Sequence, residues 1–219
     1  MGPRINPKDL TRPVQLIGEG DTDAEFVQSL TVAHSVDDVF DFHAAGGKHG
    51  FEAKLRALQQ LRGWRDVKAV VIVSDNDDDP ATALADRRKQ AGRALAGVAW
   101  PEQSWTLADG SPAVSFVMLP GPNETGCLET LLREIAWRTS DGDAGRECVE
   151  EFARCTGVND WSPSEQAKMR WHALVAGLNR ADPGQATRYL LQKRGDVFDF
   201  QHPRLQGLAA FLRSVAERC

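Results

Sequence analysis

The stretch VKAVVIVSDNDDDP, residues 67–80, decides the fold class of this 219-residue chain. Its first seven residues are apolar apart from Lys68, and most of them are β-branched. Such a run predicts a strand that is buried on both faces, as in a parallel sheet covered by helices. Ser74 and a run of acids follow directly, so we expect the strand to end in a loop rich in carboxylates.

The segments on both sides of this strand alternate between strand-like and helix-like patterns. Strands are expected at 14–17, 36–42, 67–73 and 113–119, and helices from Thr22, over 51–61 and over 81–95. The segment 105–107 is expected to form a hairpin with the last strand, which would lie in the centre of the sheet. This order predicts an α/β fold with an open, mostly parallel central sheet and helices on both faces.

The pattern changes after Leu119, where the chain becomes helical with short polar joints. Helices are expected at 128–138, 146–156, 164–178, 184–192 and 203–218. We therefore divide the chain into an N-terminal arm (1–12), an α/β core (13–122) and a C-terminal helical extension packed on the core (123–219).

Composition argues against several classes of protein. The chain has 26 Lys and Arg against 31 Asp and Glu, a net charge of −5, which argues against nucleic-acid binding through a bulk positive field. No apolar run reaches the ~18 residues of a membrane span and no secretory signal is present, so we expect a cytoplasmic protein without a membrane partner. The four cysteines have no zinc-ligand spacing and are expected to be reduced, and buried or incidental.

The acidic residues are unevenly distributed along the first half of the chain. Seven of them fall into two short clusters: Glu19, Asp21 and Asp23, then Asp75, Asp77, Asp78 and Asp79. Without these seven, the basic residues would outnumber the acidic ones. Bound divalent ions would neutralise part of the clustered charge, so the net charge does not exclude a phosphate-bearing substrate.

Both acidic clusters follow predicted strands, as do Gly46-Gly47-Lys48 and the segment 121–129. In open α/β sheets, ligands bind at the carboxyl ends of the strands. Converging carboxylates there form the oxygen-rich site that Mg²⁺ or Mn²⁺ prefers. We expect these metal ligands: Glu19, Asp23, Asp75, Asp77, Asp79 and Glu129. Each also has a structural alternative, since acids favour helix starts and turns.

Other readings of the Asp-x-Asp run are tested by spacing. An EF-hand loop requires Gly at its sixth and Glu at its twelfth position, where this chain has Pro80 and Asp86, so we exclude it. A haloacid-dehalogenase-type phosphatase carries Asp-x-Asp after its first strand, whereas here the motif follows the third, which makes this class less favoured. Neither GxxxxGK[ST] nor GxGxxG occurs, which excludes P-loop and Rossmann nucleotide sites.

The acidic motifs resemble those of the Toprim domain. Its first motif is matched by Glu19-Gly20-x-Thr22-Asp23-x-x-Phe26, and its second by Asp75-x-Asp77. This resemblance covers about residues 13–122. The whole chain is similar to the small stand-alone Toprim-like families of bacteria, which are related to the overcoming-lysogenization-defect nucleases.

The resemblance implies a Toprim-like fold with a Mg²⁺-binding acidic centre. It assigns Glu19 as acid/base or metal ligand, Asp75 and Asp77 as metal ligands, and Asp23 as the second acid of the first motif. Related nucleases also use a lysine near the scissile phosphate. The candidates are Lys48, Lys168 and Lys193, and Lys48 stands with Glu19 as our catalytic prediction.

The chain departs from two groups of Toprim proteins. Unlike full overcoming-lysogenization-defect proteins, it is expected to lack an ATPase domain. Unlike topoisomerases, it is expected to lack a domain with a tyrosine nucleophile, because its only tyrosine, Tyr189, lies in the predicted helical region; water is therefore the expected nucleophile. We expect a Mg²⁺- or Mn²⁺-dependent nuclease or phosphodiesterase acting on nucleic acid, within a defence or nucleic-acid-processing system. The alternatives are a non-catalytic Toprim-like binding module that works with a partner ATPase, and a small-molecule phosphatase.

Overall fold

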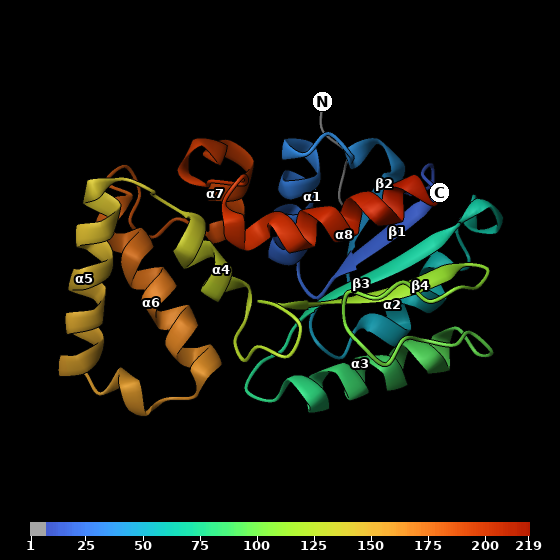
Figure 1. The fold of residues 1–219 in the computed structure, drawn as a ribbon, viewed down its shortest axis with the longest axis horizontal. Helices are drawn as coiled ribbons and strands as arrows, with labels where there is room; N and C mark the ends of the chain where they lie inside the picture. Colours follow the sequence, from blue (N-terminus) through green and yellow to red (C-terminus); the bar gives the residue numbers. More distant parts are fainter. Residues whose placement is uncertain (1–7) are drawn as a thin grey trace.

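The computed structural model describes residues 8–219, and its centre is a sheet of parallel strands in the order β2-β1-β3-β4 (Figure 1). The strands are β1 (Val14–Gly18), β2 (Phe40–Ala44), β3 (Ala69–Asp75) and β4 (Ala113–Leu119). Every residue of β3 is buried, as the apolar run predicts. The predicted α/β class, a parallel sheet flanked by helices with a helical C-terminal region, is confirmed.

The strand register brings the carboxyl ends together. Gly18 of β1 lies opposite Ala44 of β2 and Val73 of β3, and Asp75 lies opposite Leu119 of β4. The loops that follow all four strands therefore leave the sheet along the same edge. This edge is where a parallel sheet offers its ligand site.

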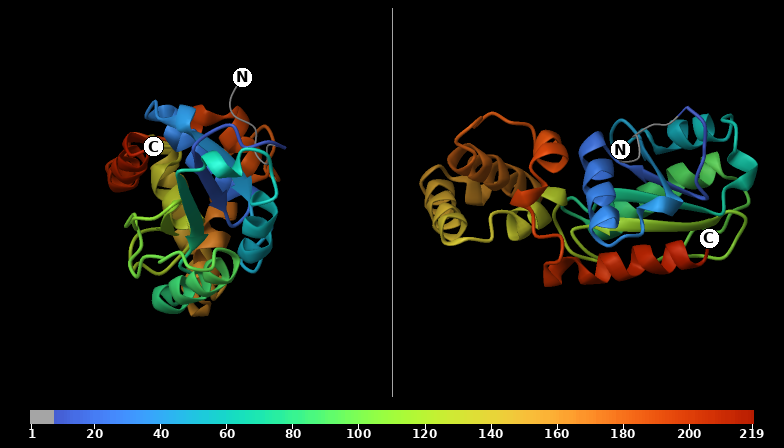
Figure 2. Two further views of the ribbon diagram at one scale, coloured as in Figure 1. Left: turned by 90° about the vertical axis from the view of Figure 1, so that its right-hand side faces the viewer. Right: turned by 90° about the horizontal axis from the view of Figure 1, so that it is seen from above.

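Helices cover both faces of the sheet (Figure 2). One face packs against α1 (Asp21–Ala33) and α8 (Gln206–Glu217), and the other against α2 (Phe51–Leu58) and α3 (Pro80–Ala94). Alternation along β1 produces this division, since Leu16 belongs to the first core and Ile17 to the second.

The remaining long helices gather beyond the carboxyl ends of the strands (Figure 1). They are α4 (Leu128–Ile135), α5 (Ser140–Cys155), α6 (Pro163–Leu178) and α7 (Thr187–Lys193). Trp171 is fully buried among them and donates its indole N–H to Thr187 at 2.7 Å. Its apolar surroundings are continuous with the core under α1 and α8, so these helices and the sheet share one core.

Short 3-10 helices connect several of these elements: Asp37–Val39, Trp64–Asp66, Val158–Asp160, Gly195–Val197 and Pro203–Leu205. Residues 1–7 of the predicted N-terminal arm lie outside the described residues. In the rest of the arm, Leu10 is buried, and the Thr11 and Arg12 N–H groups donate to the Asp41 carboxylate. None of the helices in residues 8–219 has both the length and the apolar composition needed to span a bilayer.

Two predicted strands are wrong in detail. The strand expected over 36–42 begins at Phe40, because Asp37 and Asp38 lie in a 3-10 turn. The expected hairpin is reduced to one antiparallel bridge between Ala108 and Val114, and β4 lies at the edge of the sheet rather than in its centre. Trp105 explains the loss of the hairpin, since it has a φ of 60° and a side chain that donates to the Met118 carbonyl.

Three predicted helix starts are also wrong. The helix expected over 146–156 begins at Ser140, because the Thr139 hydroxyl caps it by accepting from the Gly142 N–H. The helix expected over 184–192 begins at Thr187. The helix expected from Thr22 begins at Asp21 and has Gly20 as its N-cap. The reason is Asp23, whose carboxylate accepts a hydrogen bond from the Gly20 N–H at 2.8 Å. This bond places the Asp23 carboxylate at the carboxyl edge of the sheet rather than in solvent.

Candidate metal centre

Four carboxylates from three segments of the chain meet at the carboxyl edge of the sheet. Glu19 follows β1, Asp23 lies in the first turn of α1, Asp75 ends β3, and Glu129 lies in the first turn of α4. We call these four residues the carboxylate cluster. The sequence predicted all four, and the structure brings them together.

Asp75 lies at the middle of the cluster and is only 9% exposed. Its Oδ1 accepts a hydrogen bond from the Leu128 N–H at 2.8 Å, which joins the end of β3 to the start of α4. Burial raises the pKa of Asp75 well above its ordinary value, and the negative charges of Asp23, Glu129 and Glu19 raise it further.

Asp23 is similarly buried at 8% exposure. Burial raises the pKa of Asp23 from 3.8 to about 7; the Gly20 N–H opposes this shift, and the charges of Glu19 and Glu129 add to it. Carboxylates packed in this way repel one another unless a cation lies among them. A divalent cation would supply that charge and favour the ionised forms of Asp23 and Asp75.

Glu19 is held by a pair of residues that the sequence prediction missed. Ser74 Oγ donates to Glu19 Oε2 at 2.6 Å, and the Arg87 guanidinium contacts the same oxygen at 3.3 Å. Arg87 Nε also donates to Ser74 Oγ at 2.8 Å, which closes a triangle of hydrogen bonds. Within residues 8–219, Glu19 Oε1 has no hydrogen-bond donor and is left for a ligand.

Arg87 is the buried cation of this triangle, with a side chain that is 3% exposed. Its guanidinium lies over the Phe51 ring, 5.6 Å from the centroid. Its position in α3 marks it only weakly in the sequence, because Arg88 and Arg93 lie on the same helix. Which of these arginines turns inward depends on how the helix docks on the sheet.

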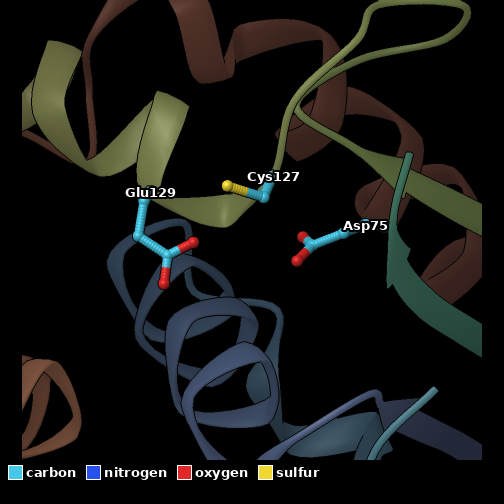
Figure 3. Close-up of side chains that lie close together, drawn as sticks. All are labelled: Asp75, Cys127 and Glu129. Carbon is cyan, nitrogen blue, oxygen red and sulfur yellow. The ribbon is translucent and has the colours of Figure 1, made fainter. Parts of the chain in front are cut away.

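Cys127 is a second residue of the site that the sequence prediction missed. It is the N-cap of α4 and is fully buried. Its sulfur and the carboxylate oxygens of Asp75 and Glu129 lie within 4.8 Å of one another (Figure 3). Burial strongly raises the pKa of the Cys127 thiol, and the charges of Glu129 and Asp75 act in the same direction.

The three acids after Asp75 have separate positions. Asp77 is half-buried in a left-handed conformation, with φ of 50°, and its carbonyl accepts from the Gly126 N–H at 2.7 Å. Asp78 is exposed and accepts from the Ser164 N–H at the start of α6. Asp77 therefore borders the cluster, while Asp78 ties the loop to α6.

Asp79, a predicted metal ligand, is not brought into the cluster. It is the N-cap of α3, and its carboxylate accepts from the N–H groups of Ala81 and Thr82 and from the Thr82 hydroxyl. The Thr82 hydroxyl and N–H lower the pKa of Asp79. This carboxylate is therefore committed to the helix rather than to a ligand at the carboxyl edge.

The three candidate lysines also differ in position. Lys168, on α6, is solvent-exposed and faces the cluster: burial lowers its pKa, but the charges of Cys127, Asp75, Glu129 and Asp77 together raise it above its ordinary value. Lys48, in the loop after β2, is exposed and lines a cleft with Asp77 and Asp79. Lys193 ends α7 and lines neither of the clefts described below.

Two clefts flank the cluster. The first, of about 370 Å³, lies between α4, α5 and α6, and its wall includes Glu129, Arg133 and Arg170. The second, of about 260 Å³, lies between the loop after β2 and the start of α3. Glu129 borders the first cleft and Asp77 the second, so a ligand could approach the cluster from either side.

These features define an α/β protein with a carboxylate cluster at the carboxyl edge of a parallel sheet. The chain belongs to the family described as "Protein of unknown function (DUF3226)", which it matches over residues 13–217. The match includes the sheet and the helices from α1 to α8, so the helical region is part of the family's common unit. Searches of curated proteins and of solved structures gave no match.

Proposed function

We propose that this protein is a metal-dependent nuclease or phosphodiesterase that hydrolyses nucleic-acid phosphodiesters. The observation that carries the proposal is the carboxylate cluster, in which Asp23 and Asp75 are buried and have raised pKa values. Burying ionisable acids together costs stability, so such a group is a candidate for function rather than for support of the fold.

The donor set fits Mg²⁺ or Mn²⁺, both of which take carboxylate oxygens. The proposed ligands are the four residues of the carboxylate cluster and the bordering Asp77. Glu19 would bind through Oε1, and Asp75 through the oxygen that does not accept from the Leu128 N–H. A bound divalent ion would stabilise the charge on a reacting phosphate and lower the pKa of a water molecule.

Among the candidate lysines, Lys168 is best placed to contact a phosphate at the cluster. Its charge interacts with Asp75, Asp77 and Glu129, and it stays protonated because those anions raise its pKa. An ammonium group there would donate to a non-bridging phosphate oxygen. Lys48 is left to the second cleft, where it could hold a more distant part of the substrate.

The relationship to Toprim-like and overcoming-lysogenization-defect nucleases stays a prediction. So do the partner ATPase, the role in defence and the two alternatives, a binding module and a small-molecule phosphatase. What supports the nuclease over a binding module is the combination of free carboxylate oxygens on Glu19 and Asp75 with a facing lysine.

The test is hydrolysis of single- and double-stranded DNA and RNA with Mg²⁺ or Mn²⁺, using wild type and Asp75→Asn. The variant keeps an oxygen for the Leu128 N–H but removes the central charge. Asp38→Asn, an exposed acid on a 3-10 turn, is the matched control. We expect hydrolysis in wild type and control, and its loss in Asp75→Asn; equal hydrolysis in all three would refute the proposal.

A thermal-shift titration distinguishes the alternatives. A metal that binds only the folded chain raises its stability by RT ln(1 + [L]/Kd). A shift with metal but no turnover would favour the binding module. Hydrolysis of small phosphomonoesters without action on nucleic acid would favour the phosphatase.

A further inference from the structure

Cys127 brings a sulfur atom into the carboxylate cluster. In Figure 3 its side chain and those of Asp75 and Glu129 point into a common space between the end of β3 and the start of α4. We propose that this space takes a thiophilic divalent cation, such as Zn²⁺ or Co²⁺, bound by the Cys127 sulfur and by oxygens of Asp75 and Glu129. This inference rests on the proposed metal centre and concerns which ion it selects.

The first argument is the position of the Asp75 carboxylate. Asp75 is 9% exposed, and its Oδ1 accepts a hydrogen bond from the Leu128 N–H at 2.8 Å, which holds the carboxylate beside the start of α4. The second carboxylate oxygen is the one that a cation between Asp75, Cys127 and Glu129 would bind.

The second argument is distance. Donor atoms bound tetrahedrally to one zinc ion at ~2.0–2.3 Å lie about 3.3–3.8 Å apart. The Cys127 sulfur and the oxygens of Asp75 and Glu129 already lie within 4.8 Å of one another. The side chain of Glu129 is only partly buried, and its rotation toward Cys127 and Asp75 would close the remaining gap of about 1 Å.

The third argument is the chemistry of the donors. Mg²⁺ binds oxygen almost exclusively, whereas thiolate sulfur selects softer ions such as Zn²⁺. The Cys127 thiol now donates weakly to the Ser164 carbonyl, at 3.8 Å. On metal binding its proton leaves to solvent and the sulfur binds as a thiolate, so no oxidant or reductant is needed. The sulfur therefore shifts the preference of the site from Mg²⁺, which a cluster of carboxylates alone would bind, toward Zn²⁺ or Co²⁺.

Cobalt titration of the full chain tests this assignment, because sulfur bound to Co²⁺ gives a near-ultraviolet charge-transfer band that oxygen ligands do not give. The chain has four cysteines, and the other three, Cys148, Cys155 and Cys219, are exposed. A variant with all three changed to Ser leaves Cys127 as the single thiol. We expect the band in wild type and in this triple variant, and its loss in Cys127→Ser.

Affinity gives a second readout. Cys127→Ser should weaken Zn²⁺ binding by at least about tenfold, the lower range found when even an outer-shell partner is removed. Binding of Mn²⁺ should change by less than about threefold, since its ligands are oxygens. If Cys127→Ser does not fold, the triple variant still decides the question by keeping or losing the band.

The outcomes separate this inference from the proposed function. Co²⁺ that binds without the band, or with a band that persists in Cys127→Ser, overturns the sulfur assignment and leaves the carboxylate metal centre standing. No binding of Co²⁺, Zn²⁺, Mg²⁺ or Mn²⁺ overturns both.

Discussion

Replacing Ser74 by Ala should weaken both the fold and the metal centre. The Ser74 hydroxyl is fully buried, donates to Glu19 at 2.6 Å and accepts from Arg87 Nε at 2.8 Å. The substitution leaves the buried guanidinium without one acceptor and Glu19 without its shorter hydrogen bond. Hydrogen bonds to charged groups are worth about 1.5–3 kcal/mol each, and Arg87 keeps its direct contact with Glu19. We therefore expect the free energy of unfolding to fall by about 2–4 kcal/mol.

The matched control is Ser115→Ala. Ser115 is also fully buried, but it lies within β4 and its hydroxyl makes only a 3.4 Å contact with the Phe116 carbonyl. The same truncation there should cost less than about 1 kcal/mol. Urea denaturation of both variants without metal measures the difference in stability.

Metal affinity should also depend on the hydrogen bonds among Ser74, Glu19 and Arg87. Without the Ser74 hydroxyl, Glu19 loses the shorter of the two hydrogen bonds that hold its Oε2 atom. Loss of a partner that orients a ligand typically costs 10–100-fold in metal affinity, so Mn²⁺ binding measured by calorimetry should weaken by about that factor. If Ser74→Ala and Ser115→Ala match each other in both stability and Mn²⁺ affinity, the triangle does not hold Glu19 and our reasoning is wrong.

Three further predictions follow from the cluster and its surroundings. The pKa of Asp23 rises on folding from 3.8 to about 7, so the folded chain binds this proton more tightly than the unfolded chain, and the Asp23 contribution to metal-free stability should fall between pH 4 and pH 7 by on the order of 3 kcal/mol. Buried His43, whose pKa is lowered to about 4, contributes in the opposite direction over this range, so the Asp23 contribution is the difference in pH dependence between wild type and Asp23→Asn. Urea denaturation of both proteins at several pH values measures this difference, and the same pH profile of stability in wild type and Asp23→Asn would contradict it. Lys168→Met should lower kcat for phosphodiester hydrolysis by about 10²-fold. The control Lys68→Met, just before β3 at the amino end of the sheet, should leave kcat within about twofold of wild type. Equal kcat values in the two variants would mean that Lys168 has no part in the mechanism. Asp79→Ala should lower the melting temperature because it removes the N-cap of α3, whereas Asp79→Asn should keep the cap and the melting temperature. Neither variant should change Mn²⁺ affinity by more than about twofold. A large loss of affinity would show that Asp79 is a metal ligand.

The positions of Glu19 and Asp75 could be predicted because their signals are local. An apolar run followed by acids marks a strand end, and parallel strands place such ends at one edge. The edge position of β4 could not be predicted in this way. Strand order depends on which surfaces meet in three dimensions, and the apolar pattern of 113–119 suits a centre or an edge equally.

Asp79 shows how a local signal can be overlooked. An acid directly before a proline, with Thr82 three positions on, is typical of a helix N-cap. In the sequence, Asp79 and Asp75 belong to one acidic run, and charge alone does not indicate which of these carboxylates faces a ligand and which caps a helix. The hydrogen bonds to Ala81 and Thr82 separate Asp79 from Asp75.

Arg87 and Cys127 could not be identified as site residues from the sequence, and for the same physical reason. Each is placed by the docking of a helix, α3 for Arg87 and α4 for Cys127, rather than by a strand end. One adds a buried cation beside Glu19, and the other adds a sulfur beside Asp75. The features that would tune the metal centre thus come from tertiary packing.

The positive charge around the carboxylate cluster lies at its periphery. The Arg87 guanidinium donates to Glu19 Oε2, and Lys168, which is solvent-exposed, faces the cluster. The N-termini of α1 and α4 add partial positive charge through the Gly20 N–H on Asp23 and the Leu128 N–H on Asp75. All four contributions lie at the periphery, and Asp23 and Asp75 still have raised pKa values. No basic side chain lies among these acids in residues 8–219, and the proposed divalent ion would supply the positive charge that the surrounding groups do not bring into the middle of the cluster.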